Sequence, residues 1–444
     1  MAGNRLPEFD RGKAVSLRCE GEPVRAFAGE NIAVALYARG AGVLSRSLKY
    51  HRPRSFFCLE GHCGACLMRI GGVPNLRACM EPCAEGLSVE GQNAYPSPDM
   101  DVLGAVDWLF PDGMNHHTLM TGSRLLNQVV SKVVRQLSGL GTLPGSPEPA
   151  TACESPAWDE LEVDVLVVGG GPAGLAAAEA SAAAGARTVV CDEHDRPGGS
   201  LLADPRHGPR DAAGRADAAR RAGARALLRT TFIGHYPEDG GVLLLAGPDR
   251  LTRVRARQVV YATGGYAQTL LFANNDRPGV MAARAVGRLL VRYGVAPAGR
   301  VCLVIGRDAD RDQTDALAAA LVAAGSEVVT VDERREQILA ARGRVWVSAL
   351  EVAGADGQVR RVPCNMVAVA APPSPASEGP RQHGCEVDLR PSEGGFAVVA
   401  DRDGRTSVAG ILACGDVCGA TTAERAAAAG TRAGRAAAAG AGAR

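Results

Sequence analysis

The chain has 444 residues and a formal net charge of +1, with 46% hydrophobic and 22% charged residues. A length of this order predicts about three domains. The near-zero net charge excludes the strongly basic field on which nucleic-acid binding depends. The N-terminal residues contain no apolar core of signal-peptide length, and no run of 18 apolar residues occurs. We therefore expect a cytoplasmic protein with no nucleic-acid partner and no membrane span.

Thirteen cysteines in such a chain indicate metal ligation or buried thiols rather than disulfides. Cys58, Cys63, Cys66 and Cys79 form a C-x4-C-x2-C-x12-C pattern, and its first three cysteines have the spacing of plant-type [2Fe–2S] proteins. Glycines in this loop would let the thiolates converge and leave backbone N–H groups free to bond the sulfurs. Zinc is the main alternative, although zinc-binding C-x2-C pairs normally come in twos. Unligated thiols are the other alternative to the predicted cluster.

The residues around these cysteines predict a β-grasp, ferredoxin-like domain at residues 1–98. Strand, strand and helix are expected at residues 14–17, 23–28 and 32–38. A glycine turn at residues 71–72 would lead into the strand that brings Cys79 to the loop. Cys83 is interpreted as a spare thiol near the cluster, and Cys19 as a buried small apolar residue.

A helical linker is expected at residues 99–160. Apolar spacing predicts an amphipathic helix at 125–137, and a stretch rich in proline and glycine follows it. His116 and His117 are adjacent, so they cannot share one helix face, and we interpret them as structural or exposed rather than metal-binding.

Residues 163–199 predict a complete β-α-β dinucleotide unit. A buried strand at 165–168 is followed by Gly169, Gly171 and Gly174 at G-x-G-x-x-G spacing, then by an alanine-rich helix and a second strand. These glycines permit, in order, the tight turn, the approach of a pyrophosphate and close packing of helix on strand. Asp192, 23 residues after Gly169, stands near the usual position of the acid that binds a ribose hydroxyl.

Two further stretches carry a family resemblance. The sequence SLKYHRPRS (47–55) with the cysteine loop after it, and FANNDRPGVM (272–281), resemble the α subunits of heterotetrameric sarcosine oxidases. They also resemble related multi-subunit amine and imino-acid dehydrogenases, including hydrogen cyanide synthase and opine oxidase. The four cysteines move the resemblance towards the dehydrogenase branch. The end of the chain at Arg444 predicts a short form without the folate-binding domain. Lys49, His51, Arg52 and Arg54 form a basic patch that either docks an acidic partner or is solvated.

The resemblance implies a flavoprotein with two dinucleotide-binding domains. Residues 198–201 resemble the loop after the ribose acid, the Ala-Thr-Gly turn at 262–264 resembles the domain crossover over the cofactor, and the Gly-Asp pair at 415–416 resembles the one that holds FAD. The expected contacts are Gly169, Gly171, Pro172, Ala173, Gly174, Asp192, Glu193, Gly199, Ser200, Leu201, Thr263, Gly264, Gly415 and Asp416.

The nucleotide domain is expected at residues 161–285 and 384–444, with a second, degenerate nucleotide-binding domain at 286–383. Residues 301–333 read as strand, helix and strand, but only Gly306 of a fingerprint is present. Asp308 and Asp310 would repel a pyrophosphate, so this second site is expected to be lost. Cys414 and Cys418, which flank Asp416, are interpreted as packing residues rather than redox partners.

The resulting fold class is α/β, and the expected function is that of an electron-transfer subunit. The resemblance implies an FAD-dependent amine dehydrogenase partner of β type, with or without further small subunits, and a downstream electron acceptor. The substrate would be sarcosine, proline or hydroxyproline, glycine or an opine. NAD or ATP in place of FAD, and FMN at a subunit interface, stay open. The alternative functions are a self-contained NAD(P)H-dependent flavin and iron–sulfur reductase, and a chain whose nucleotide is structural only.

Overall fold

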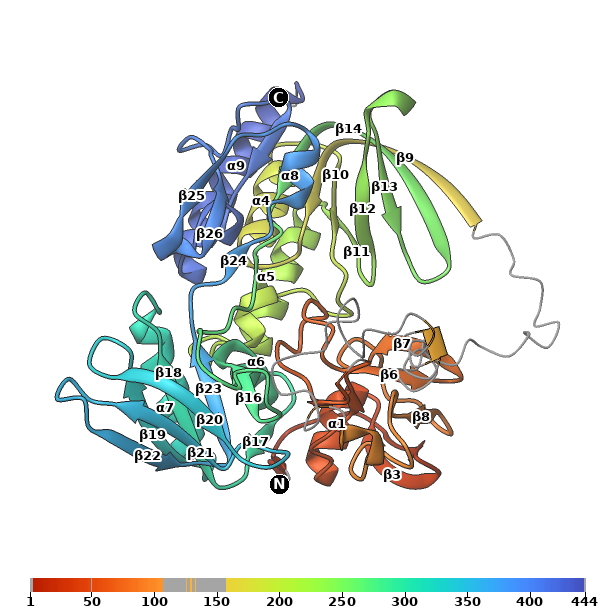
Figure 1. Ribbon diagram of the computed structural model, residues 1–444. Helices are drawn as coiled ribbons and strands as arrows, with labels where there is room; N and C mark the ends of the chain where they lie inside the picture. The colour runs from red at the N-terminus through yellow and green to blue at the C-terminus, as the bar shows by residue number, and fades with distance from the viewer. Residues whose placement is uncertain are drawn as a thin grey trace.

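The computed structural model describes residues 3–48, 50–105, 107, 125, 128–129, 132 and 157–442. Figure 1 shows three units: an N-terminal unit at the lower right, a first βαβ unit at the top and a second βαβ unit at the lower left. The chain leaves the first βαβ unit at β15 (Gly265–Tyr266) and returns at β24 (Ser374–Pro375), and these two strands pair antiparallel. The first βαβ unit is therefore made from two separated stretches of sequence.

The N-terminal unit is a five-stranded sheet with one helix across it. Its strand order is β3-β2-β8-β6-β7, and β2 and β8 are parallel, which is the β-grasp arrangement that the sequence predicts. The helix α1 (Ile32–Arg39) begins at Asn31, whose side chain accepts from the Val34 N–H, and ends at Gly40. The strands of this sheet are β2 (Ala14–Cys19), β3 (Glu22–Phe27), β6 (Leu67–Ile70), β7 (Val73–Arg77) and β8 (Ser88–Glu90). A separate pair is formed by β4 (Ser45–Arg46) and β5 (Pro53–Arg54), and the 3-10 turn η1 (Val102–Gly104) follows β8 in the chain.

The first βαβ unit has a parallel sheet that continues into an antiparallel hairpin. The order is β11-β10-β9-β14-β13-β12, with β27 paired to β14. Its strands are β9 (Ala157–Val168), β10 (Thr188–Cys191), β11 (Arg225–Leu227), β12 (Thr231–Tyr236), β13 (Val242–Ala246), β14 (Arg250–Tyr261), β25 (Val387–Arg390), β26 (Gly395–Val398) and β27 (Ile411–Ala413). Its helices are α4 (Pro172–Ala183), α5 (Pro209–Arg221), α8 (Glu378–Gln382) and α9 (Ala423–Gly440), with 3-10 turns η2 (Gly199–Leu202), η3 (Pro237–Asp239), η4 (Pro391–Glu393) and η5 (Asp416–Cys418).

The alanine and glycine content of α4 and α9 is explained by how closely the two helices pack. A Cβ atom at Gly430 would lie 2.0 Å from the carbonyl oxygen of Ala173, and one at Gly434 would lie 2.2 Å from that of Ala177. Larger side chains would force the helices apart. This contact fixes α4, and with it the glycine turn at its start, against the C-terminal stretch of the chain.

The second βαβ unit has a four-stranded parallel sheet, ordered β16-β23-β18-β19. The strand-helix-strand expected at 301–333 is present as β18, α7 and β19. Because β16 belongs to this sheet, the crossover lies before β16 rather than after the expected limit at residue 285. The elements are β16 (Val280–Ala282), α6 (Ala283–Val291), β17 (Val295–Pro297), β18 (Arg300–Ile305), α7 (Arg311–Ala323), β19 (Glu327–Asp332), β20 (Gln337–Arg342), β21 (Ala349–Ala353), β22 (Val359–Pro363) and β23 (Met366–Ala370).

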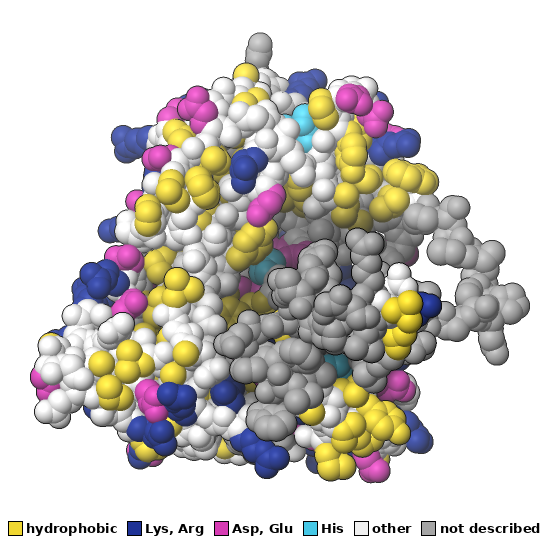
Figure 2. All heavy atoms as spheres, in the orientation of Figure 1, with side chains coloured by type: hydrophobic (Ala, Val, Ile, Leu, Met, Phe, Trp, Pro, Cys, Tyr) yellow, Lys and Arg dark blue, Asp and Glu magenta, His cyan; other side chains and the backbone are white. Residues whose placement is uncertain are grey.

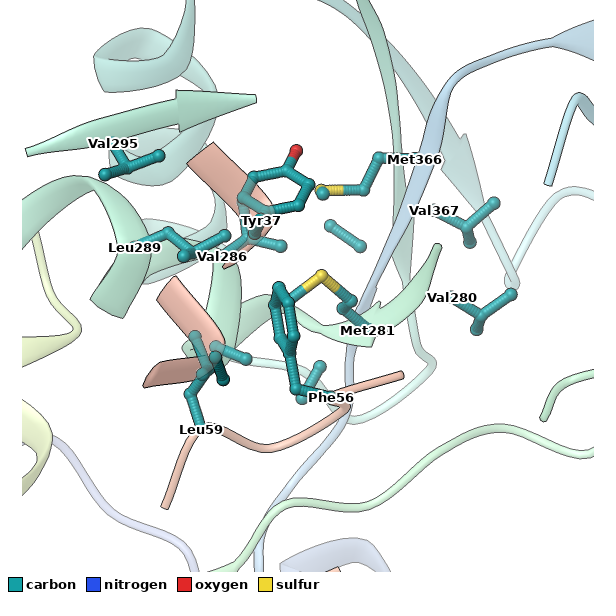
Figure 3. Close-up of a cluster of buried hydrophobic side chains, with 14 of the residues drawn as sticks. Tyr37, Phe56, Leu59, Val280, Met281, Val286, Leu289, Val295, Met366 and Val367 are labelled. Atoms are coloured by element: carbon teal, nitrogen blue, oxygen red, sulfur yellow. The ribbon is translucent and has the colours of Figure 1, made fainter. Parts of the chain in front are cut away.

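One hydrophobic core joins the N-terminal unit to the second βαβ unit. In Figure 3, Tyr37 and Phe56 of the former lie among Met281 and Met366 of the latter. The Tyr37 and Phe56 rings meet edge to face at 5.5 Å, and Tyr37 stacks near Trp346 at 6.3 Å. The buried residues 32–37 of α1 are apolar on all sides because they contact both units.

The start of the chain adds a backbone connection between these two units. The strand β1 (Gly3–Arg5) pairs antiparallel with β17, and a guanidinium nitrogen of Arg11 donates to the carbonyl oxygen of Gly294 at 2.6 Å. The N-terminal unit is thus held by strand pairing as well as by its core.

Several expectations fall outside the described residues. They are His116, His117, Lys49 and most of the helix expected at 125–137, of which residues 125, 128, 129 and 132 are helical. On the face seen in Figure 2, Lys and Arg side chains are interspersed with Asp and Glu, as the near-zero net charge predicts.

Candidate functional site

The glycine turn between β9 and α4 leaves room for a ligand at one position and none at the others. Gly169 has φ of 103°, and a Cβ there would lie 2.4 Å from the carbonyl oxygen of Ala262. A Cβ at Gly174 would lie 1.8 Å from the carbonyl oxygen of Gly169, so this glycine serves packing. At Gly171, the N-cap of α4, the nearest atom to a Cβ is 3.9 Å away. The open space lies where the helix N-terminus presents free N–H groups, which suits a pyrophosphate.

Asp192, at the end of β10, is held in place by the glycine turn itself. Its Oδ2 accepts from the Gly170 N–H at 2.6 Å, and its Oδ1 accepts from the His194 N–H at 2.8 Å and lies 3.0 Å from His194 Nδ1. Burial alone would raise the pKa of Asp192, but the hydrogen bonds and charge of His194 lower it below its ordinary value. Burial opposes the charge of His194, yet the contact with Asp192 raises the His194 pKa. The two side chains therefore form an ion pair.

These groups lie on a cavity of about 300 Å³, within the usual range of small-molecule sites. The predicted contacts that it brings together are Gly169, Gly171, Pro172, Ala173, Asp192, Glu193, Gly199, Ser200, Thr263, Gly264, Gly415 and Asp416. Gly174 and Leu201 do not line it: Gly174 packs helix on strand, and Leu201 is fully buried against Leu202 and Ala212. Open space at Gly171, a helix N-terminus and a buried carboxylate together fit an adenine dinucleotide.

The far wall of the cavity comes from residues that the sequence patterns did not indicate. Arg284 and Arg288 project into it from α6. Arg284 donates to Asp416 Oδ2 at 2.9 Å, while Asp416 Oδ1 accepts from the Thr421 N–H at 3.0 Å. Asp416 is thus oriented from both sides. Two arginines four residues apart in an otherwise apolar stretch are the signal that could have revealed this wall.

The four predicted cysteines converge in the N-terminal unit. The thiol of Cys58 contacts those of Cys63 and Cys79, and the thiol of Cys79 also contacts that of Cys66. The Cys63 contact is the main cause that lowers the pKa of Cys58, and the Cys79 contact lowers the pKa of Cys66. Within the described residues, no group of three His, Cys, Asp or Glu side chains has the arrangement of a site for a single metal ion. The thiol contacts run from Cys63 through Cys58 and Cys79 to Cys66.

The cysteine loop has the backbone that a cluster needs. Gly61 and Gly64 have φ of 81° and 63°, a region that other residues rarely adopt. The Glu60 N–H donates to the sulfur of Cys58 at 3.4 Å, and backbone N–H groups also reach Cys63 and Cys66. Arg77 Nη1 donates to the Gly61 carbonyl oxygen at 2.6 Å and steadies the loop. Four thiols with N–H donors match the ligand set of a [2Fe–2S] cluster.

The cysteine loop is also part of the nucleotide cavity. Glu60 and His62, which lie between Cys58 and Cys63 in sequence, line it. The His62 ring meets Tyr266 edge-on at 4.6 Å, and its Nε2 is 3.8 Å from Glu193. The two predicted cofactor sites therefore share a wall.

Comparison with known proteins agrees with both sites. Residues 12–94 match the family described as a 2Fe-2S iron-sulfur cluster binding domain, and residues 164–232 match the FAD dependent oxidoreductase family. The chain is 35% identical over 368 residues to the sarcosine oxidase alpha subunit of Rhizobium meliloti (strain 1021), covering 76% of this chain and 36% of that protein. The chain is thus similar to the sarcosine oxidase alpha subunits. The two domain matches support a [2Fe–2S] cluster and FAD as its cofactors.

The chain is also similar to other proteins. An opine oxidase subunit of Agrobacterium tumefaciens (strain Ach5) is 28% identical over 319 residues, covering 59% of this chain and 63% of that protein. The structure of L-proline dehydrogenase from P. horikoshii has a TM-score of 0.65 at 21% identity, over 93% of this chain and 70% of that one, and shows the same fold. The chain spans about a third of the sarcosine oxidase subunit it matches, namely 36%. No helix in the described part of this chain is long and apolar enough to cross a membrane.

The basic segment of this chain is paired with acidic side chains of the same chain. His51 is buried with its Nδ1 3.0 Å from Asp101 Oδ2, and Arg52 donates to Asp107 at 2.8 Å. Arg54 lies 3.7 Å from Asp276, which belongs to the second resemblance stretch. His51, Arg52 and Arg54 therefore contact acidic residues of their own chain, while Arg52 and Arg54 stay 45% and 36% exposed, which is compatible with the solvated alternative.

In the second βαβ unit of this chain, carboxylates lie where a second nucleotide would bind. Asp310 caps α7 by accepting from the Gln313 N–H at 3.1 Å. Asp332, at the end of β19, is bound by Arg311 at 2.9 Å. A Cβ at Gly306 would lie 2.6 Å from the carbonyl oxygen of Ala370. Gly306 and Asp332 correspond to Gly169 and Asp192 of the first unit, so the fold is kept, and Asp310 at the N-terminus of α7, where a pyrophosphate would bind, favours loss of the second site.

Burial keeps three of the other thiols neutral. Burial raises the pKa of Cys83 to about 12, and it does the same for Cys418 beside the nucleotide cavity. Burial raises the pKa of Cys19, which is partly exposed, to about 11. Neutral thiols are poor nucleophiles, which favours packing roles for these three cysteines.

Proposed function

We propose that this chain is the electron-transfer subunit of a multi-subunit, FAD-dependent amine or imino-acid oxidase or dehydrogenase. The observation that carries the proposal is the wall shared by the cysteine loop and the dinucleotide cavity. A flavin accepts electrons in pairs and a [2Fe–2S] cluster passes them singly, so neighbouring sites suit a relay between donor and acceptor. The sarcosine oxidase and opine oxidase relatives are themselves named as subunits.

In this proposal, the chain's own residues bind and position the cofactors. Gly169, Gly171 and the N-terminus of α4 receive the pyrophosphate, and Asp192 receives the ribose. Asp416, fixed by Arg284, faces the other end of the dinucleotide. The cluster ligands are Cys58, Cys63, Cys66 and Cys79.

The proposed partner is an FAD-dependent dehydrogenase subunit of β type that removes the hydride from the substrate C–N bond, with a downstream acceptor for the electrons. The substrate class is sarcosine, proline or hydroxyproline, glycine or an opine. We place the protein in the cytoplasm, since the cysteines that the structure describes are all free thiols.

The test compares the isolated chain with the complex formed by co-expression with its β-type partner. Each is assayed with sarcosine, proline, hydroxyproline, glycine and opines, using an artificial dye as acceptor. The complex should reduce the dye with at least one amine, and the isolated chain with none. Dye reduction by the isolated chain, or rapid NADH oxidation by it, would favour the self-contained reductase instead.

A second measurement identifies the nucleotide. Heat release followed by chromatography should recover FAD, held non-covalently. Recovery of NAD or ATP alone would reject the flavin assignment and favour a structural nucleotide in the same cavity.

A further inference from the structure

Glu60 is a buried carboxylate with only one of its oxygens in use. It lies in the cysteine loop, two residues after Cys58, and its side chain is 9% exposed. Its Oε1 forms an ion pair with Arg288 of α6. Its Oε2 has no hydrogen-bond partner among the described residues. An unpaired oxygen on a buried carboxylate is costly, so its presence calls for a partner that binds there.

Arg288 links this carboxylate to the glycine turn of the first βαβ unit. It is 3% exposed, and it donates to the carbonyl oxygens of Leu59 at 3.4 Å and Gly199 at 3.3 Å. Gly199 adjoins Gly171, where the open space for a pyrophosphate lies. Both Glu60 and Arg288 line the cavity, and Arg288 Nε is likewise without a partner in the described part of the chain. The Glu60–Arg288 pair therefore lies on the surface of the cavity, where it can contact a ligand, and not behind the cavity wall.

A purely structural role for the pair does not account for the spare oxygen. If Glu60 only tied the cysteine loop to α6, packing would be expected to give both oxygens partners, as it does for Glu30, whose two oxygens accept from Arg5 at 2.8 and 2.9 Å. The spare atoms of Glu60 and Arg288 instead belong to two side chains that line one cavity.

We propose that Glu60 is a nucleotide-binding residue supplied by the iron–sulfur domain, and that its free oxygen accepts a hydrogen bond from a hydroxyl or N–H group of the bound dinucleotide. This inference rests on the proposed function, because it assumes that the cavity holds a dinucleotide. It extends that function by making the cluster domain part of the nucleotide site. Because the Glu60 N–H also bonds Cys58, nucleotide binding steadies the loop that carries the cluster.

The test uses the variant E60Q in the full-length chain. A glutamine can keep its oxygen on Arg288, and it then turns an NH2 group, which cannot accept, towards the cavity. We expect FAD to bind the apo form of E60Q about ten-fold more weakly than wild type, as for loss of a hydrogen bond to a charged group. FAD binding is followed by quenching of its fluorescence. The matched control is E22Q, since Glu22 is exposed on β3 of the same unit.

A second measurement needs no variant. The rate at which a chelator removes iron from wild-type protein is recorded with and without FAD. FAD should slow the removal several-fold, because a nucleotide bound to Glu60 steadies the loop that carries Cys58. This arm also decides the matter if E60Q does not retain its cluster.

Three results would overturn the inference. They are wild-type affinity in E60Q, the same loss of affinity in E22Q, or an iron-removal rate that FAD does not change. If E60Q alone binds FAD normally, the proposed function stands without this residue. If wild-type protein binds no FAD, the flavin assignment fails together with the inference.

Discussion

At the scale of single residues, contacts sort the cysteines into two groups. Cys58, Cys63, Cys66 and Cys79 contact one another, whereas Cys83, close in sequence, does not share their hydrogen bonds. Spacing alone predicts the first group. The sequence favours Cys79 over Cys83 through the strand expected before it, and in the structure Cys79 follows β7 closely.

The first prediction uses this difference. Cys63→Ser should abolish the EPR signal of the reduced protein, while Cys83→Ser should keep it. Wild-type protein should contain about two irons and about two acid-labile sulfides per chain, as for one [2Fe–2S] cluster. Zinc near one per chain, without sulfide, would contradict the assignment.

The second prediction concerns pH and the Asp192–His194 pair. Contact with Asp192 raises the pKa of His194 above its ordinary 6.5, so the pair stabilises the fold fully below pH 6.5 and loses this effect as the pH rises through the raised pKa. At the acid end, the contribution falls as the pH drops through the lowered pKa of Asp192. His194→Gln should therefore lower the melting temperature most between these limits. The expected loss in the free energy of unfolding is on the order of 1 kcal/mol. A deficit that does not change between pH 5 and 9 would show that His194 does not titrate.

At the scale of elements, glycines let α4 lie close both to α9 and to the glycine turn that precedes it. Gly174→Ala should be strongly destabilising, because its Cβ would meet a backbone carbonyl oxygen at 1.8 Å. Gly214→Ala in α5 is the matched control: its Cβ has nothing within 4 Å, and alanine favours a helix by about 0.5–1 kcal/mol. Denaturant unfolding of both variants is the measurement. Equal stability of the two would remove the packing argument.

The sequence predicted the elements that local patterns define and missed those formed by tertiary contact. The βαβ unit was predicted because its glycines and strands are adjacent in the chain. The strand β9 begins earlier than expected, at Ala157, since its first half alternates polar residues and is held by pairing with β14. Arg284 and Arg288 stand out in the sequence, but their place in the wall could not be predicted, because the wall joins residues near 60, 170 and 288 that meet only in the folded chain.

At the scale of the whole molecule, the N-terminal unit and the second βαβ unit share one core. We predict that they unfold together. Amides of α1 and β18 should exchange hydrogen with the same free energy of opening, as parts of one cooperative unit. The β12–β13 hairpin, which lies outside this core, serves as the comparison. Exchange of α1 in a separate, earlier step would show that the iron–sulfur domain is an independent module.

The pairing of β1 with β17 joins segments that are far apart in the chain, so the contacts between the N-terminal unit and the second βαβ unit form late in translation. The cysteine loop leaves the ribosome early, but α6, whose Arg288 binds Glu60 of the loop, follows more than 200 residues later. At about 5–20 residues per second, this is a delay on the order of ten seconds or more. During translation Glu60 and the Leu59 carbonyl oxygen are thus without Arg288, the partner that α6 later supplies. In that interval the cysteine loop is open on this side.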